Sequence, residues 1–315
     1  MGEREFSMTI LCLIGAVLSG TAQNILKKAF GKRCRGGTFF FSAVTALFAL
    51  AVFLAVNRSR HYDPAVLPYA SGFAASYICA TVFALLAIRY GSLAKTSLIL
   101  SYSLLVPCAY GILFLGEPVT PSLLIGLAAL GLSLFLIRGP AEKEKTPPPV
   151  NDTREDVPQP QNEKLPARAG RPWLWLTFVL LAFAGNGLCS TVQKAEGLAL
   201  GSDGTHLFMI TALGISAAVM LALSLFSPDE RGRFGTLCRR GFWLGALCGI
   251  LNGVTNVLVI FLNPQVPASV LFPLIGGGGM VLVFLWSCLF EKETFTVRQI
   301  VGFILGVLSI VLLNF

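Results

Sequence analysis

Apolar runs of about 20 residues recur along the whole chain and are separated by short polar stretches. A helix of that length matches the hydrocarbon core of a bilayer, which is about 30 Å thick. Backbone groups in lipid must satisfy one another, so each run is predicted to be a helix. The predicted spans are 8–30, 39–56, 67–88, 93–115, 121–137, 173–192, 207–226, 242–262, 266–290 and 297–313.

Residues 138–172 interrupt this pattern with seven Lys or Arg, six Asp or Glu and several prolines. Such a composition cannot bury an apolar core and is typical of a solvated, flexible linker. It divides the chain into a first five-helix unit, residues 1–137, and a second one, residues 173–315.

The two units resemble each other in sequence. With a shift of 176 residues, 113–136 falls on 289–312 with eight identities in 24 positions, including the polar pairs Glu117/Glu293 and Thr120/Thr296. Because five is odd, consecutive units of this kind cross the membrane in opposite orientations. The predicted fold is therefore an all-α integral membrane protein with ten transmembrane helices, arranged as two inverted five-helix repeats.

Composition and charge agree with a membrane protein. The chain is 55% hydrophobic and 13% charged, whereas soluble proteins carry about 25% charged residues. The net charge of +8 does not indicate nucleic-acid binding, because Lys and Arg lie in the connections, where they set orientation and meet anionic lipid. If the N-terminus is cytoplasmic, 20 of the 24 Lys and Arg lie on the other side, so the positive-inside rule favours both termini outside.

The sequence carries no signature of enzyme chemistry. The eight cysteines lie mostly inside spans, without C-x-x-C or metal-ligand spacing, so we expect packing residues and no metal or cofactor. Paired carboxylates, a histidine cluster and G-x-S-x-G are absent from the sequence, so we do not expect an enzyme.

The five-plus-five plan, "FLGEPVT" at 114–120 and its second copy "LFEKETFT" at 289–296 resemble the drug/metabolite transporter superfamily, EamA type. The segments "LPYASGFAASYICATVFALLAIRYG" (67–91) and "VPASVLFPL" (266–274) are similar to sequences of a group of these proteins in Gram-positive bacteria. The resemblance implies a bacterial plasma-membrane protein with a cavity between its repeats, through which small organic solutes or metabolites move, often outward. It also implies cytoplasmic termini, so the orientation stays open.

Polar side chains within the spans are the candidates for a transport path, because such groups are costly in lipid. They either line a cavity or bond neighbouring helices, and both interpretations stay open. Tyr102 is the preferred contact, since an aromatic ring with a polar tip suits an organic solute. The predicted substrate-binding residues are Gln23, Asn24, Ser76, Tyr77, Tyr102, Asn186, Ser190, Gln193, Lys194, Asn252 and Asn256.

Two further sets of residues have predicted structural roles. Candidate hinges, which close helix packing would explain equally well, are Pro107, Pro273, Gly276, Gly277, Gly278 and Gly279. Predicted caps at helix starts are Glu117, Thr120, Glu293 and Thr296. No Asp, Glu or His lies deep within a predicted span, so proton coupling through a buried carboxylate is not expected.

The expected function is transport of a small organic solute by alternating access, as an exporter or an exchanger. One alternative is a nucleotide-sugar or other organic-anion carrier that uses Lys28 and Lys194. Another is a membrane scaffold or sensor that transports nothing. The expected partners are a small-molecule substrate and the lipid bilayer, not nucleic acid, and a homodimer is left open.

Overall fold

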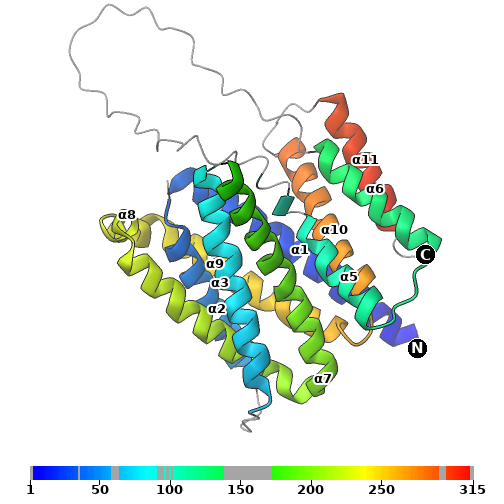
Figure 1. Ribbon diagram of the computed structural model, residues 1–315, viewed down its shortest axis with the longest axis horizontal. Coiled ribbons are helices and arrows are strands. Elements are labelled where there is room, and N and C mark those ends of the chain that lie inside the picture. The colour runs from blue at the N-terminus through cyan, green and yellow to red at the C-terminus, as the bar shows by residue number, and fades with distance from the viewer. Residues whose placement is uncertain are drawn as a thin grey trace, which may run out of the picture.

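The computed structural model describes residues 3–34, 36–57, 64–90, 96, 99–100, 102–137, 172–290 and 296–312. The elements in these ranges are all helical (Figure 1). They are α1 (Glu3–Arg33), α2 (Thr38–Val56), α3 (Val66–Tyr90), the 3₁₀ turn η1 (Tyr102–Leu104), α5 (Leu105–Phe114), α6 (Pro121–Ile137), α7 (Pro172–Phe226), α8 (Pro228–Arg231), α9 (Phe234–Leu262), α10 (Ala268–Leu289) and α11 (Val297–Leu312). The predicted linker lies outside the described residues except for Pro172, which begins α7.

Seven helical segments in the described part of the chain are long and apolar enough to cross a membrane, and shorter apolar helices cover Tyr102–Phe114, Pro121–Ser133 and Val297–Ser309. The prediction of an all-α membrane protein is confirmed at this level. Most predicted spans agree with a helix to within a few residues, although α9 begins eight residues before the predicted start at 242.

The connection between the predicted spans 173–192 and 207–226 is helical, contrary to expectation. All residues of α7 from Pro172 to Phe226 are helical, but Figure 1 shows that the chain reverses direction within this element, so that its first part descends and its second part rises again. Residues 193–200 include good helix formers such as Ala, Leu, Lys and Glu, so the helical pattern persists beyond the apolar run. The first candidate span of α7 therefore reaches Leu200.

The fourth predicted span, 93–115, is described only in part, because 91–95, 97–98 and 101 lie outside the described residues. Within it, residues 96, 99 and 100 are helical, and the chain continues through η1 into α5. Pro107 is the third residue of α5. A proline is tolerated there, because first-turn amides have no partner within the helix.

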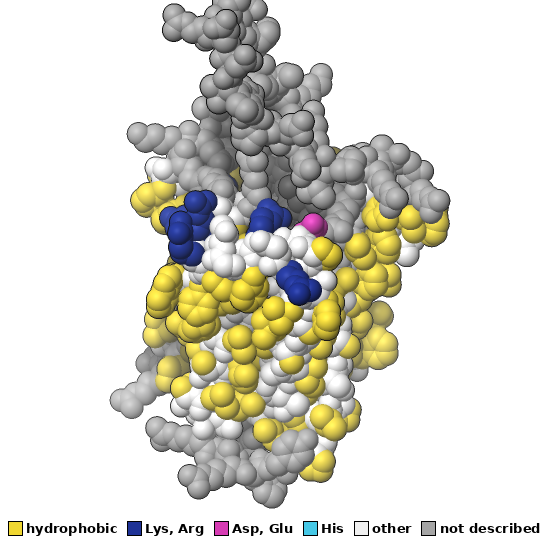
Figure 2. Space-filling view, turned by 90° about the vertical axis from the view of Figure 1, so that its left-hand side faces the viewer, with side chains coloured by type: hydrophobic (Ala, Val, Ile, Leu, Met, Phe, Trp, Pro, Cys, Tyr) yellow, Lys and Arg dark blue, Asp and Glu magenta, His cyan; other side chains and the backbone are white. Residues whose placement is uncertain are grey.

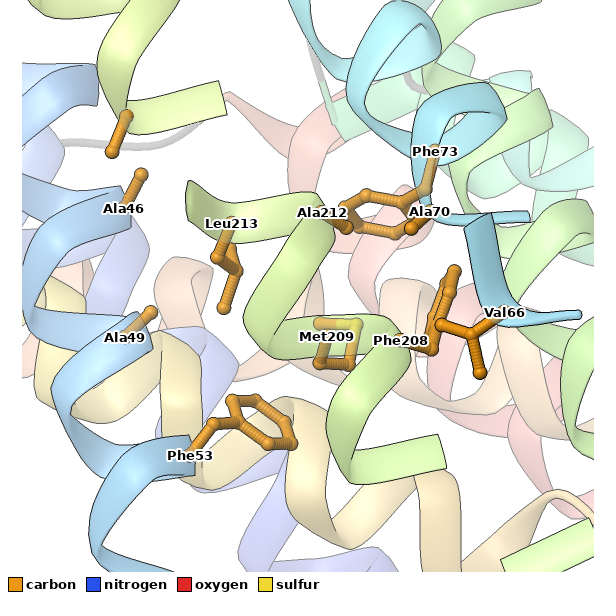
Figure 3. Packing of buried hydrophobic residues seen from close by; sticks show 11 residues of the cluster. Ala46, Ala49, Phe53, Val66, Ala70, Phe73, Phe208, Met209, Ala212 and Leu213 are labelled. Carbon is orange, nitrogen blue, oxygen red and sulfur yellow. The ribbon is translucent and has the colours of Figure 1, made fainter. Parts of the chain in front are cut away.

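A buried apolar cluster joins α2, α3 and the second part of α7 (Figure 3). Phe53 of α2 and Phe208 of α7 are fully buried. The rings of Phe73 on α3 and Phe208 pack edge to face at 5.6 Å between centroids. Alanines fill the remaining places, which lets the three helix axes approach one another.

Glycines allow close approaches between helices. A Cβ on Gly249 of α9 would lie 2.5 Å from the carbonyl oxygen of Thr45 on α2, and one on Gly185 of α7 would lie 2.8 Å from that of Ser76 on α3. A methyl group at either place would push two helices apart. These two contacts join helices that border the cavity described next.

Candidate substrate cavity

A cavity of about 500 Å³ lies among α1, α2, α3, α7 and α9. Its exposed lining residues are Lys27, Gly31 and Gly36, near the connection between α1 and α2, together with Asn186 on α7. At its inner end it reaches Asn252, in the middle of α9. The mouth of the cavity is therefore at the end of the bundle where α1 ends and α2 begins.

One face of α1 forms part of the wall. Lys27, Phe30, Gly31 and Cys34 all line the cavity, and their spacing of three, four and seven residues places them in one stripe along a helix. The rings of Phe30 and Phe41, the latter from α2, are tilted against each other with centroids 4.4 Å apart. This wall thus combines one cation with an aromatic surface.

The facing wall is polar. Ser42 on α2 and Tyr77 on α3 both line the cavity, and their side chains hydrogen-bond to each other. On α7, Asn186 Nδ2 donates to Ser103 Oγ of η1 at 2.5 Å. Hydroxyl and amide groups from both halves of the chain therefore face the same space.

Beyond the inner end of the cavity, a chain of amide hydrogen bonds ties α1, α7 and α9 together. Asn252 Nδ2 donates to Gln23 Oε1 at 3.1 Å, and Gln23 Nε2 donates to Thr255 Oγ1 at 2.8 Å. Asn256 Nδ2 donates to Asn252 Oδ1 at 3.1 Å, and Gln193 Nε2 donates to Asn256 Oδ1 at 3.3 Å. Gln23 and Gln193 are buried, so this network closes the cavity floor.

The connection between α9 and α10 is held by a buried lysine. Lys194 Nζ donates to the carbonyl oxygens of Asn263 at 2.5 Å and Val266 at 2.8 Å. Asn263 Nδ2 in turn donates to the Gln193 carbonyl at 3.3 Å. The lysine side chain is 3% exposed. Its positive charge stabilises the C-terminal, carbonyl end of α9, which is the negative end of the helix dipole.

Glu117 holds the other side of the same connection. Its Oε1 accepts from the Ala268 amide at 2.6 Å and its Oε2 from the Ser269 amide at 2.8 Å, at the start of α10. Gly111 leaves room for this carboxylate, since a Cβ there would lie 2.3 Å from Oε2. We call Lys194, Glu117 and Asn263 the clamp.

The clamp and the cavity mouth lie at opposite ends of the bundle. Thr9 Oγ1, near the start of α1, donates to Gln265 Oε1 in the clamped connection at 2.5 Å, whereas Lys27, near the end of α1, lines the mouth. The two positions on α1 are about 27 Å apart along the helix axis. The bundle is therefore open at one end and tied by polar contacts at the other.

Glu230 makes a contact at the mouth end that parallels the one made by Glu117. Its Oε1 and Oε2 accept from the amides of Phe39 at 3.0 Å and Phe40 at 2.9 Å, at the start of α2. Glu117 from the first half thus caps a helix of the second half, and Glu230 from the second half caps a helix of the first.

Of the predicted substrate-binding residues, Tyr77, Asn186 and Asn252 line the cavity. Gln23, Gln193 and Asn256 bond neighbouring helices instead, and Lys194 belongs to the clamp. The Tyr102 hydroxyl donates to the Gly131 carbonyl of α6 at 2.7 Å. The remaining candidates, none of which lines this cavity, are Asn24, Ser76 and Ser190.

The candidate hinges lie in regular helix. The helix α10 continues through Pro273 and all four glycines, Gly276, Gly277, Gly278 and Gly279, where an unwound segment was one interpretation. A Cβ on Gly277 would lie 2.7 Å from Leu130 Cδ1 on α6. Close packing of α10 on α6 therefore explains Gly277.

The predicted caps behave differently from one another. Thr120 Oγ1 accepts from the Leu123 amide at 3.2 Å at the start of α6. Thr296 Oγ1 accepts from the Gln299 amide at 3.4 Å, and Gln299 Oε1 accepts from the Thr296 amide, which is a capping box. Glu117 caps α10 rather than its own neighbour α6, and Glu293 lies outside the described residues.

Sequence reasoning missed several buried or cavity-lining residues. Glu196 is fully buried and lies four residues before the end of the span Trp173–Leu200, whereas the predicted span ended at 192 and left it outside. Asn263 is 2% exposed and carries the clamp, and Lys27 lines the cavity. The helical spacing of Lys27 from Phe30 and Gly31 could have indicated its position.

No protein-family model and no curated protein matches the chain. A search of solved structures does find similar folds. One of them, described only as "Crystal structure of protein", aligns with a TM-score of 0.67 at 16% identity, over 97% of this chain and 96% of that one. At this identity the likeness concerns the fold alone, which extends over nearly the whole of both chains.

Proposed function

We propose that this protein is a carrier of small organic solutes that works by alternating access, as a plasma-membrane protein of the EamA type. One observation carries the proposal. A cavity lined with polar groups is open at one end of a membrane-spanning bundle, while the clamp ties the other end. That is the arrangement expected of one of the two end states of such a carrier.

The packing of the helices supports two inverted repeats in this proposal. The repeat pairs α1, α2, α3, α5 and α6 with the first part of α7, its second part, α9, α10 and α11. Under this correspondence the contact of α1 with α9 exchanges with the contact of α3 with α7, and both are extensive. The pairs α5/α10 and α6/α11 each join a helix to its own counterpart, as an approximate two-fold axis requires.

The chemistry of the clamp suits an end that opens and closes. Its contacts are made by an ammonium, a carboxylate and backbone groups. Water can satisfy all of these groups when the contacts break, so the exchange costs much less than leaving them unpaired. The nucleotide-sugar alternative gains no support from Lys194, because its Nζ donates to two backbone carbonyls.

Cysteine accessibility tests the proposal without knowledge of the solute. Thr81 lines the cavity on α3, so Thr81→Cys is made in a chain whose native cysteines are replaced. A membrane-impermeant thiol reagent is then added to right-side-out and to inside-out vesicles. We expect labelling from one side only, and labelling from both sides once Lys194→Met releases the clamp.

Ser71→Cys is the matched control, since Ser71 is an exposed hydroxyl residue of α3 that does not line the cavity. Its labelling should not respond to Lys194→Met. Glu117→Gln provides a second, milder release of the clamp. If both clamp variants fold and position 81 is still reached from one side only, the bundle does not alternate, and a scaffold or sensor becomes the better description.

A further inference from the structure

The cavity wall holds one cation and no described carboxylate. Lys27 is the only charged side chain among the described lining residues, and the other polar ones are hydroxyls and the amides of Asn186 and Asn252. Lys27 is exposed at the mouth, so its ammonium is accessible to a ligand that enters the cavity. Among the described residues no carboxylate forms an ion pair with Lys27, so the wall has a charge that a ligand can complement.

Lys27 is directed at the cavity by its place on α1. It shares the lining stripe with Phe30 and Gly31. Lys28, the next residue, does not line the cavity. Two adjacent lysines of one helix therefore stand in different environments.

An aromatic surface lies beside this ammonium. Phe30 and Phe41 pack against each other, and Tyr77 lines the facing wall. A volume of about 500 Å³ falls within the range that small organic ligands occupy. A solute with one ring or a branched apolar body would bury that body here while its polar end meets Lys27.

The surroundings of the mouth favour anions. Figure 2 shows Lys and Arg toward one end of one face of the molecule, with an acidic side chain close by. Arg233 lies beside the mouth, since its Nη2 would be 3.3 Å from a Cβ on Gly36, which lines the cavity. Arg231 and Asp229 are exposed nearby, whereas Glu230 is 5% exposed and occupied with the start of α2. An excess of positive charge at a cavity entrance raises the local concentration of anionic ligands.

We infer that the solute is a small organic monoanion with an aromatic or branched apolar body, whose anionic group binds Lys27. This inference rests on the carrier proposed above. One ammonium balances one negative charge, so a monocarboxylate fits the wall better than a nucleoside diphosphate. The apolar body lies against Phe30, Phe41 and Tyr77.

Three ligands with the same phenyl body but different charge test whether the solute is an anion. Phenylacetate is the anion, phenylacetamide its neutral analogue and phenethylamine the cation. Binding to the purified protein is measured by isothermal titration and by thermal stabilisation in detergent. We expect phenylacetate to bind at least about 10-fold more tightly than the amide, since a charge-assisted hydrogen bond contributes on that scale, and phenethylamine to bind most weakly.

Variants of the two neighbouring lysines locate the effect. Lys27→Gln should remove the preference for phenylacetate, while Lys27→Arg, which keeps the charge, should retain it. Lys28→Gln removes the same charge from the same helix and should leave the preference in place. If both Gln variants lose it equally, the anion responds to the general field and Lys27 is not its anchor.

Other results would overturn the inference directly. Equal binding of phenylacetate and phenylacetamide would show that the ammonium is not used, and no binding of phenylacetate would exclude this class of solute. Neither result touches the carrier itself, which the labelling of position 81 decides independently. A chain that alternates but ignores phenylacetate carries a different solute.

Discussion

The two ends of the bundle use charged side chains in opposite ways. At the clamped end, the side chains of Lys194 and Glu117 hydrogen-bond to backbone groups of one connection, between α9 and α10. At the mouth, Lys27 lines open space and has no described carboxylate as its partner. One end thus has its charges satisfied by the protein, and the other has a charge left for a ligand.

This difference shows that polar residues within membrane spans can have two roles, bonding between helices or lining of a cavity. Amides in the middle of the spans, such as Gln23 and Gln193, bond helices to each other. Groups that line the cavity lie closer to the mouth and alternate with small residues such as Ala80 and Ala84. Burial of a polar group by itself does not identify a substrate contact, because interhelical bonding satisfies it equally well.

Loss of the clamp lysine should have the largest effect. Lys194→Met leaves the carbonyls of Asn263 and Val266 without their donor, so we expect the free energy of unfolding in detergent to fall by about 3 kcal/mol. Chemical denaturation measures it. Lys194→Arg keeps the charge and should lose less. If Met is as stable as Lys at this position, the two ends do not differ as described.

A larger side chain between α2 and α9 should have the second-largest effect on stability. Gly249→Ala places a methyl group 2.5 Å from the Thr45 carbonyl oxygen, so the helices must separate and stability should fall by about 2 kcal/mol. Gly214→Ala is the matched control, because a Cβ there meets nothing within 4 Å. Equal melting temperatures for the two variants would contradict the close approach.

Removal of one clamp charge should be milder. Glu117→Gln keeps the shape and one acceptor at the start of α10 but loses the carboxylate, so we expect a loss of about 1 kcal/mol. Because a charge effect of this kind is screened by salt, the loss should shrink when denaturation is repeated at high ionic strength. A loss that is independent of salt would point to packing instead.

Tyr102→Phe should have the smallest effect. It removes one hydrogen bond, to the Gly131 carbonyl, and interhelical bonds of this kind contribute about 0.6 kcal/mol in membranes. Binding of phenylacetate should not change, because Tyr102 does not line the cavity. A loss of affinity with unchanged stability would restore Tyr102 as a substrate contact.

Hydrophobic pattern alone predicted the helical class and most span positions, because lipid leaves the backbone no other choice. It failed where helix continues beyond the apolar run, as in α7, since polar helix formers such as Lys194 and Glu196 end the hydropathy signal without ending the helix. In the fourth predicted span, 93–115, the 3₁₀ turn at Tyr102–Leu104 was not predicted, because a turn of three residues inside an apolar run leaves no hydropathy signal of its own.

The site was harder to predict than the spans. Tyr77, Asn186 and Asn252 were found because they are polar within apolar surroundings. Lys27 was not among the predicted binding residues, because a lysine near the end of a span is usually an interfacial anchor. Glu117 was recognised as a cap, but its helix is 151 residues away in sequence, at Ala268, and no local pattern encodes such a pairing.

The exchange of caps between the halves has a consequence for biosynthesis. When the ribosome has delivered the first half to the membrane, the start of α2 still lacks Glu230, which follows Phe40 by 190 residues. Glu117 likewise lacks its partners until α10 has been synthesised. The first half therefore cannot reach its final structure before the second is inserted, and the insertion machinery must shelter an incomplete bundle until the last helices arrive.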